Sequence, residues 1–283
     1  DVDKVYDGTI ELDADSSLKI TIDGQTIQLS WDEAEFDDPN VDDVEEVTFF
    51  DVTGTSEDGN YVIDMNRLRL DAKGAIKSRD LTISGITAND RSYNGKNDLS
   101  VTLTYLGIKY ENRIEGDEVW LNTDLVQGQF ADGNAGIHDV YISNLILTGA
   151  DVSNYTLTNT TLTVQAEITP KVISATVAYI DSEKEYDGNT SVQEHNCSID
   201  KLIIKGDDVR LLDEFAYDSA DAGARQISAT QWELAGADAD NYILQSFTPI
   251  AGTIVPRAIT VTATNTGKVY GEADPRLEWQ ITR

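Results

Sequence analysis

Cysteine, histidine and long apolar segments are scarce in this sequence of 283 residues. The single cysteine, Cys197, cannot form a disulfide bond within the chain, so we expect packing to hold the fold together. There are two histidines, His138 and His195. No apolar run approaches the ~20 residues that a membrane-spanning helix needs. These scarcities argue against a disulfide-stapled fold and against membrane insertion by this part of the chain.

Basic side chains are also few. The sequence has 21 Lys and Arg against 51 Asp and Glu, a net charge of −30, and the acids are spread along the whole chain. Such a field repels the phosphates of nucleic acids and of anionic lipids, so we expect neither as a partner. The same charge attracts divalent cations and keeps a crowded array soluble.

A short motif around Tyr-Asp-Gly recurs and organises the chain. It reads Lys-Val-Tyr-Asp-Gly at 4–8, Arg-Ser-Tyr-Asn-Gly at 91–95, Lys-Glu-Tyr-Asp-Gly at 184–188 and Lys-Val-Tyr-Gly at 268–271. A period of about 90 residues indicates a tandem array, and a unit of that size can bury its own core. We predict three units and an incomplete fourth, at 1–78, 79–170, 171–256 and 257–283.

Alternating apolar and polar residues within each unit predict half-buried strands, and no window shows a helical stripe. The predicted fold is therefore all-β: a tandem, elongated array of antiparallel β domains, either immunoglobulin-like sandwiches or β-grasp-like. The absence of a helix favours the sandwich. Ile-x-Pro/Ser-Lys/Arg joints without Gly/Ser-rich linkers predict stiff connections. The first unit opens directly at its motif without the strand that precedes it elsewhere, so we expect the sequence to be an excised piece of a longer chain.

Several further elements recur in the same order after the Tyr-Asp-Gly motif. They are Gly-Asp-Glu/Asp-Val at 116–119 and 206–209, Asn/Asp-Ala-Gly at 134–136 and 221–223, and Asn-Tyr at 154–155 and 241–242. This order resembles the YDG repeat of bacterial surface adhesins and haemagglutinin-like proteins. The tail, with Lys-Val-Tyr-Gly-Glu-Ala-Asp-Pro at 268–275, resembles the MBG-type repeat of the same proteins. The resemblance implies a secreted, all-β, multi-repeat protein at the bacterial cell surface.

The recurring tyrosines and their neighbours are interpreted as structural turns. Tyr before Asx-Gly suits a strand end whose ring packs into the core while the glycine takes a positive φ. The Asn of Asn-Tyr is predicted to cap its turn. The predicted structural residues are Tyr6, Asp7, Gly8, Asn60, Tyr61, Tyr93, Asn94, Gly95, Asn154, Tyr155, Tyr186, Asp187, Gly188, Asn241 and Tyr242.

Calcium is the one cofactor for which the sequence offers candidate ligands, although none is required. Each unit places acids beside its Asn-Tyr turn, and hard cations prefer clustered carboxylate, amide and carbonyl oxygens. The candidates are Glu57, Asp58, Asn60, Asp151, Asn154, Asp238, Asp240 and Asn241. A solvated acidic surface is the alternative interpretation of the same residues.

The resemblance also suggests a covalent cross-link, because stalk domains of some adhesins carry Lys–Asn isopeptide bonds. The candidate pairs are Lys4 with Asn60 and Lys184 with Asn241. In the second unit Arg91 replaces the lysine and cannot be the nucleophile. An ordinary surface lysine is the alternative.

No catalytic constellation recurs among the units, so we expect no enzyme activity. His195 and Cys197 form a short pair without the orienting third group that a nucleophilic site needs, and a zinc site needs more N or S ligands. With 51 acids, two suitably spaced carboxylates carry no information about catalysis.

The function predicted from the sequence is an extracellular stalk or spacer of a bacterial surface adhesin that projects a binding domain elsewhere in the parent protein. Host or environmental glycans and extracellular-matrix proteins would then be partners of the parent, and we expect this fragment to be monomeric. The alternative is that the repeats themselves bind glycan or host matrix, with calcium. Trp31, Trp120, Trp232 and Trp279 would supply stacking platforms, but their positions do not repeat between units, so core packing is favoured for most of them.

Overall fold

The computed structural model describes residues 2–12, 18–264 and 266–282. Within these ranges the chain consists of strands joined by turns, and its only helical segments are two 3-10 turns, η1 (Val152–Asn154) and η2 (Ala239–Asn241). The prediction of an all-β tandem array is confirmed. In the described ranges, no helix has the length and apolar character that crossing a membrane requires.

Contacts divide the chain into two compact units. The first comprises residues 1–90, 99–132 and 137–167, and the second comprises 91–98, 133–136 and 168–283. The first compact unit contains repeat 1 and most of repeat 2, where repeats 1, 2 and 3 are the sequence units 1–78, 79–170 and 171–256. The Tyr-Asn-Gly segment of repeat 2, within 91–98, belongs instead to the second unit, together with repeat 3.

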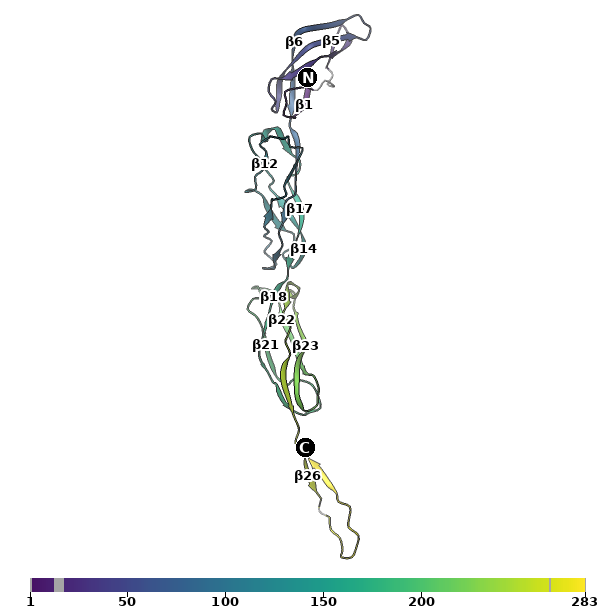
Figure 1. Ribbon diagram of the computed structural model, residues 1–283, viewed down its shortest axis with the longest axis vertical. Coiled ribbons are helices and arrows are strands. Elements are labelled where there is room, and N and C mark those ends of the chain that lie inside the picture. Colours follow the sequence, from purple (N-terminus) through teal and green to yellow (C-terminus); the bar gives the residue numbers. More distant parts are fainter. Residues whose placement is uncertain (1, 13–17, 265, 283) are drawn as a thin grey trace. The chain divides into compact units, whose positions relative to one another are not determined.

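Repeat 1 is built on one six-stranded sheet. Its order is β1-β6-β5-β3-β2, with β4 also pairing with β5. The longest strands, β5 and β6, run antiparallel side by side (Figure 1), while β1 pairs parallel with the end of β6. The strands are β1 (Val2–Val5), β2 (Leu18–Ile22), β3 (Gln25–Ser30), β4 (Glu33–Phe36), β5 (Asp42–Ser56) and β6 (Val62–Lys77).

Repeat 2 distributes shorter strands over several sheets. One sheet has the order β11-β7-β16 and another begins β13-β14-β17, with two-stranded pairs β10-β8 and β12-β15. The strands are β7 (Arg79–Ser84), β8 (Thr87–Ala88), β9 (Arg91–Ser92), β10 (Leu103–Thr104), β11 (Lys109–Glu111), β12 (Trp120–Leu121), β13 (Gln127–Phe130), β14 (Gly136–Ser143), β15 (Leu147–Thr148), β16 (Tyr155–Leu157) and β17 (Leu162–Thr169).

Repeat 3 has a four-stranded sheet of order β20-β25-β23-β22 and the pairs β19-β21 and β18-β24, and the tail forms the hairpin β26-β27. The strands are β18 (Lys171–Ile173), β19 (Ala175–Ile180), β20 (Glu183–Glu185), β21 (His195–Ile199), β22 (Arg210–Tyr217), β23 (Gly223–Ala235), β24 (Tyr242–Leu244), β25 (Ile250–Val255), β26 (Thr260–Ala263) and β27 (Trp279–Thr282). In repeats 2 and 3 the strands are divided among several sheets, and the described residues include no α-helix, which is consistent with an immunoglobulin-like array.

Buried and more exposed residues alternate along the strands, and the buried ones form the core of each repeat. Leu81 and Ile83 of β7 are fully buried, while their neighbours along the strand are partly exposed. In repeat 3 the core gathers around Phe215, Tyr217, Ile227 and Ile254. Each repeat therefore buries apolar side chains of its own, as the length of the units predicts.

Each repeat ends in the same way. The strand that carries the Tyr-Asx-Gly motif pairs parallel with the last strand of its own repeat: β1 with β6, β9 with β17, and β20 with β25. The chain then continues through Ser78, Pro170 or Pro256. The motif tyrosine is therefore held at the point where the chain leaves the repeat.

Candidate functional site

A carboxylate of repeat 2 holds two tyrosines, one from its own repeat and one from repeat 1. The Tyr6 hydroxyl donates to Asp117 Oδ2 at 2.9 Å, and the Tyr155 hydroxyl donates to the same oxygen at 2.6 Å. The two rings meet edge to face, with centroids 5.6 Å apart. The Tyr155 oxygen also accepts the backbone N–H of Ile114 at 2.9 Å. This Tyr–Asp–Tyr triad joins repeat 1 to repeat 2.

The same triad joins repeat 2 to repeat 3. The hydroxyls of Tyr93 and Tyr242 donate to Asp207 Oδ2 at 2.8 Å and 2.7 Å, and their rings meet edge to face at 5.4 Å. The N–H of Ile204 donates to the Tyr242 oxygen at 2.9 Å. The chemistry of the joint is therefore built twice from equivalent residues. We call Tyr6 or Tyr93 with its glycine the tyrosine face, and Asp117–Tyr155 or Asp207–Tyr242 the aspartate face.

The asparagine before the second tyrosine closes the first joint. The Asn154 side-chain oxygen accepts the N–H of Val41 at 2.9 Å, and its amide donates to Asn40 at 2.8 Å. Asn154 is buried, and its side-chain amide forms these bonds with repeat 1 instead of capping the 3-10 turn that it ends. The sequence interpretation of this asparagine as a local turn cap therefore differs from the structure.

Asn241 does the same at the second joint. Its side-chain oxygen accepts the N–H of Ala135 at 2.7 Å, and its amide donates to Asn134 at 3.1 Å. It too is buried, and its side-chain amide forms these bonds with repeat 2 instead of capping the 3-10 turn that it ends. Both asparagines therefore use their hydrogen-bonding groups on the preceding repeat.

The motif glycines allow the two faces to approach closely. Gly8 has φ +81° and a Cβ there would lie 3.3 Å from Ile114, while Gly95 has φ +126° and would meet Ile204 at 3.4 Å. The positive φ predicted for these glycines is confirmed. A side chain would be strained by the backbone conformation and would press on the isoleucine of the following repeat.

Burial raises the pKa values of the tyrosine hydroxyls at both joints. Burial and the hydrogen bond to Asp117 raise the pKa of Tyr6 and of Tyr155 to about 12. Burial and the bond to Asp207 raise the pKa of Tyr242 to about 12 and also raise that of Tyr93. The hydroxyls therefore stay protonated donors at neutral pH, which the shared carboxylate requires.

The two joints differ in their cationic contact. At the second joint the Lys96 ammonium contacts both oxygens of the buried Asp238 at 2.9 and 3.1 Å, and the N–H of Asp208 donates to Asp238 at 2.8 Å. That N–H and Lys96 hold the pKa of Asp238 below its usual value. At the first joint Arg79 instead donates to the carbonyls of Asn112 and Tyr6, at 2.7 and 3.2 Å.

Comparison with known families matches the YDG domain model at residues 1–67, 77–162 and 169–249. These three matches tile most of the sequence. The chain belongs to the YDG domain family. A comparison with the curated proteins finds no match.

Two solved cadherin structures are similar to the YDG array. A Drosophila N-cadherin EC1-4 structure is 10% identical with a TM-score of 0.25, over 76% of this chain and 57% of that one. The Drosophila N-cadherin EC1-3 structure is 8% identical with a TM-score of 0.20, over 90% of this chain and 97% of that one. The array thus spans less than two thirds of the EC1-4 chain.

The first lysine of the YDG motif closes the turn within its own repeat. The Lys4 ammonium contacts Asp7 at 2.7 Å and donates to the carbonyls of Thr9 and Glu11 at 3.0 and 2.6 Å. Its candidate isopeptide partner, Asn60, donates instead to Asp58 at 2.6 Å. The structure does not bring this Lys–Asn pair together.

The lysine of the third repeat behaves in the same way. The Lys184 ammonium is buried and contacts Asp187 and Asn189 at 2.8 and 2.9 Å, which holds the pKa of Asp187 below its usual value. Asn241, its candidate partner, bonds to the end of repeat 2 as described above. Both motif lysines therefore organise the turn after Tyr-Asp-Gly.

The calcium candidates are dispersed. Asp151 accepts the N–H of Glu118 at 2.8 Å, and Asp238 contacts Lys96. Asp240 and Glu57 are exposed. Across the described ranges, no group of three or more His, Cys, Asp or Glu side chains gathers as a metal site would. Calcium binding stays a prediction from the sequence.

The tryptophans divide into two pairs. The Trp31 ring meets Phe49 edge to face at 4.8 Å, and Trp232 packs against Phe247 at 5.4 Å. Trp120 and Trp279 are 45% and 64% exposed. Core packing therefore describes two of the four and not most of them.

The aspartates are the joint residues that sequence reasoning missed. Asp117 and Asp207 follow glycines in recurring Gly-Asp turns, and these turns were interpreted only as markers of the repeat. Their fixed position in the sequence could have identified them. Each of these aspartates lies after the Tyr-Asx-Gly of one repeat and before the Asn-Tyr of the next repeat. Lys96 offered no signal, because the equivalent residue of the first repeat is Thr9.

Proposed function

We propose that this YDG array is the stalk or spacer of a bacterial surface adhesin, in which each joint fixes the orientation of consecutive repeats. The observation that supports the proposal is the triad, built at two joints from equivalent residues with matching distances. A sequence that only tethered two domains would not need a carboxylate that accepts hydrogen bonds from tyrosines of both repeats.

The contacts at each joint hold separate segments of the preceding repeat. The triad holds Tyr6, and the asparagine contacts, such as Asn154 to Asn40 and Val41, hold a second segment of repeat 1. The covalent connection through Ser78 or Pro170 is a third point of attachment. Three separate attachments oppose both bending and twisting, so a joint of this kind transmits force and orientation.

Residual dipolar couplings test whether a joint is fixed. In the native chain we expect repeats 1 and 2 to report one common alignment tensor. Asp117→Ala removes the shared acceptor and should make the two tensors diverge, while Asp124→Ala, an exposed acid of the same repeat, should leave them equal. Different alignment tensors for repeats 1 and 2 in the native chain would contradict the proposal of a fixed joint.

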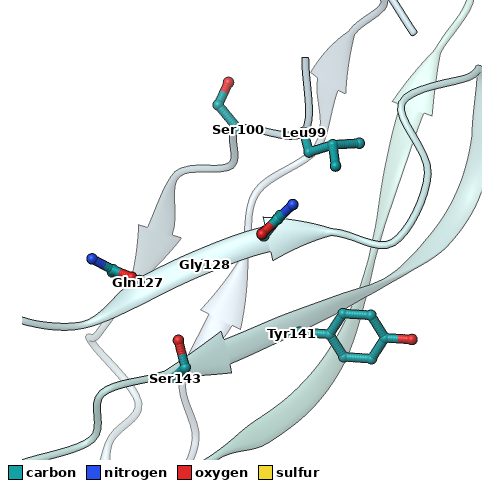
Figure 2. A pocket seen from close by; sticks show the side chains of 7 residues that line it. Leu99, Ser100, Gln127, Gly128, Tyr141 and Ser143 are labelled. Carbon is teal, nitrogen blue, oxygen red and sulfur yellow. The ribbon is translucent and has the colours of Figure 1, made fainter. Parts of the chain in front are cut away.

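The alternative function, direct binding of glycan or host matrix, has one supporting observation. A hollow of about 430 Å³ opens over β13 and β14 (Figure 2), and the ring of Tyr141 beside it is 55% exposed. It is lined by Leu99, Ser100, Gln127, Gly128, Gln129, Tyr141 and Ser143. An aromatic face beside amides and hydroxyls suits a sugar.

A binding panel separates the two functions. The chain is tested against glycans and extracellular-matrix proteins in calcium and again in EDTA. The stalk proposal predicts no saturable binding in either condition. Saturable binding that Tyr141→Ala abolishes would favour the alternative, and binding lost only in EDTA would assign calcium a part in it.

A further inference from the structure

The two tyrosines of each triad are placed as a pair that can be joined covalently. At the first joint the hydroxyls of Tyr6 and Tyr155 donate to one carboxylate oxygen, Asp117 Oδ2, at 2.9 and 2.6 Å. Their rings meet edge to face, with centroids 5.6 Å apart. Oxidised phenols couple through the carbon next to the one that bears the hydroxyl. Two hydroxyls that converge on one atom therefore bring the coupling carbons near each other.

The second joint repeats this placement with its own residues. The hydroxyls of Tyr93 and Tyr242 donate to Asp207 Oδ2 at 2.8 and 2.7 Å, and their ring centroids lie 5.4 Å apart. Elsewhere a buried tyrosine hydroxyl has a different acceptor: that of Tyr217 donates to the backbone carbonyl of Asp181 at 3.2 Å. Burial of a tyrosine alone does not produce the paired arrangement of the joints.

The shared carboxylate also supplies what the oxidation of a phenol requires. A phenol that loses one electron becomes a strongly acidic radical cation, so its oxidation is easier when a positioned base takes the proton in the same step. The carboxylates of Asp117 and Asp207 accept hydrogen bonds from the phenols that would release these protons. Both aspartates are partly exposed, so they can pass a proton on to water.

The burial of the four rings favours coupling within the pair. The exposed fractions of Tyr6, Tyr93, Tyr155 and Tyr242 lie between 2% and 7%. An electron can pass to an oxidant without contact between the oxidant and the ring, so this burial does not prevent oxidation. It does keep the rings away from the tyrosines of other chains, which leaves the partner in the triad as the radical that each one meets.

We propose that each triad is a site of oxidative cross-linking, at which its two tyrosines couple to dityrosine and join consecutive repeats covalently. Each phenol gives up one electron and one proton, and the two phenoxyl radicals form a carbon–carbon bond. The ring hydrogens at the new bond then move to the oxygens, which restores both hydroxyls. A one-electron oxidant generated from hydrogen peroxide takes the two electrons, and the peroxide with the two released protons becomes two molecules of water. Coupling draws the ring centres closer together than they lie in the structure.

The linkages would make the joints permanent. This inference rests on the proposed stalk, in which hydrogen bonds fix each joint, and it replaces that fixation by a covalent bond. One linkage joins positions 6 and 155 and the other joins 93 and 242, so the two overlap along the chain. A force applied to the ends of the chain would then pass through the linkages and not only through hydrogen-bonded strands.

Photo-oxidation of the 283-residue chain by tris(bipyridine)ruthenium(II) and persulfate tests the proposal, at a concentration low enough to keep chains apart. This reagent removes single electrons from tyrosine. We expect each linkage to lower the intact mass of the monomer by two hydrogen atoms. Digestion should yield peptides that join Tyr6 to Tyr155 and Tyr93 to Tyr242. Oxidised monomer that lacks these linked peptides overturns the proposal.

Single substitutions separate the two sites. Tyr6→Phe should abolish the first linkage and keep the second, and Tyr93→Phe should do the reverse, so each site serves as the reference for the other. Tyr217→Phe removes a buried hydroxyl outside the triads and should leave both yields unchanged. Asp117→Asn should lower the yield of the first linkage severalfold relative to the second. An unchanged ratio in that variant would show that the carboxylate does not direct the coupling, and would overturn the proposal.

The dipolar-coupling test of the native chain keeps this inference distinct from the fixed joint. A common alignment tensor for repeats 1 and 2, with no linked peptides after oxidation, removes the cross-linking proposal and leaves the fixed joint standing. Different tensors in the native chain contradict the fixed joint, whether or not linked peptides form.

Discussion

The Tyr6 hydroxyl donates to Asp117 Oδ2 at 2.9 Å across 111 positions of the sequence. The same bond links Tyr93 to Asp207 across 114 positions. Tyrosines of one short motif therefore reach into the following repeat. The value of the motif lies in joining repeats, in addition to forming a turn.

Tyr93 and Tyr186 form a matched pair for mutation, because both precede the Asx-Gly of the repeated motif while their exposure differs. Tyr93→Phe should lower the free energy of unfolding by about 1 kcal/mol through loss of the partly buried hydrogen bond to Asp207. Tyr186→Phe should leave it unchanged in dilute solution, since that ring is 41% exposed. Urea unfolding followed by fluorescence measures both. Equal effects of the two substitutions would show that the bond to Asp207 does not stabilise the joint.

The triads should open at high pH before the repeats unfold. Tyr6 and Tyr155 have pKa values raised to about 12 from the ordinary 10. A pKa raised in the folded state contributes stability that is complete below pH 10 and is lost as the pH rises through about 12. We expect the alignment tensors of repeats 1 and 2 to diverge in this pH window. The dipolar couplings within each repeat should still fit the native fold of that repeat. Unchanged tensors up to pH 12 would contradict the role given to the hydroxyls.

Repeat 1 contains a second titrating feature, near the start of β5. A hydrogen bond with Asp37, together with burial, raises the pKa of Glu45 to about 7 from the ordinary 4.5. This contribution is complete below pH 4.5 and is lost as the pH rises through about 7. The melting temperature of repeat 1 should therefore fall over that window. Glu45→Gln should flatten the profile, whereas Glu33→Gln, an exposed acid of the same repeat, should not.

Lys96 should stabilise the second joint alone. It pairs with the buried Asp238, and Lys96→Met would leave that carboxylate with the backbone N–H of Asp208 as its donor. Calorimetry should show a lower melting temperature for the second compact unit and no change in the first. Lys171→Met, a change of the same charge at the start of β18, is the control. A shift of both units together would mean that the pair does not act locally.

The turn chemistry and the period could be predicted from the sequence because they are local. Gly8, Gly95 and Gly188 all take positive φ, as glycines after Tyr-Asx do in a turn. Whether the motif tyrosine is buried could not be predicted in the same way. Tyr93 and Tyr186 have similar neighbours in sequence, yet one is buried and the other exposed, because the covering residues belong to the next repeat.

The asparagines illustrate the same limit of local reasoning. Asn154 and Asn241 follow acidic turns, where an amide normally bonds to its own backbone. In the structure both amides bond instead to the preceding repeat. A local rule predicts that such a side chain is satisfied, but it does not say from which side of the joint the partner comes.

A double-mutant cycle between Tyr6 and Asp117 tests the central claim most directly. Asp117→Ala leaves two buried hydroxyls without their acceptor and should cost about 2 kcal/mol or more. In that background, Tyr6→Phe removes an unsatisfied hydroxyl, so it should be neutral or stabilising, although alone it destabilises by about 1 kcal/mol. The predicted coupling is therefore about 1 kcal/mol or more in the free energy of unfolding. Additive effects of the two substitutions would contradict the claim that this carboxylate joins the repeats.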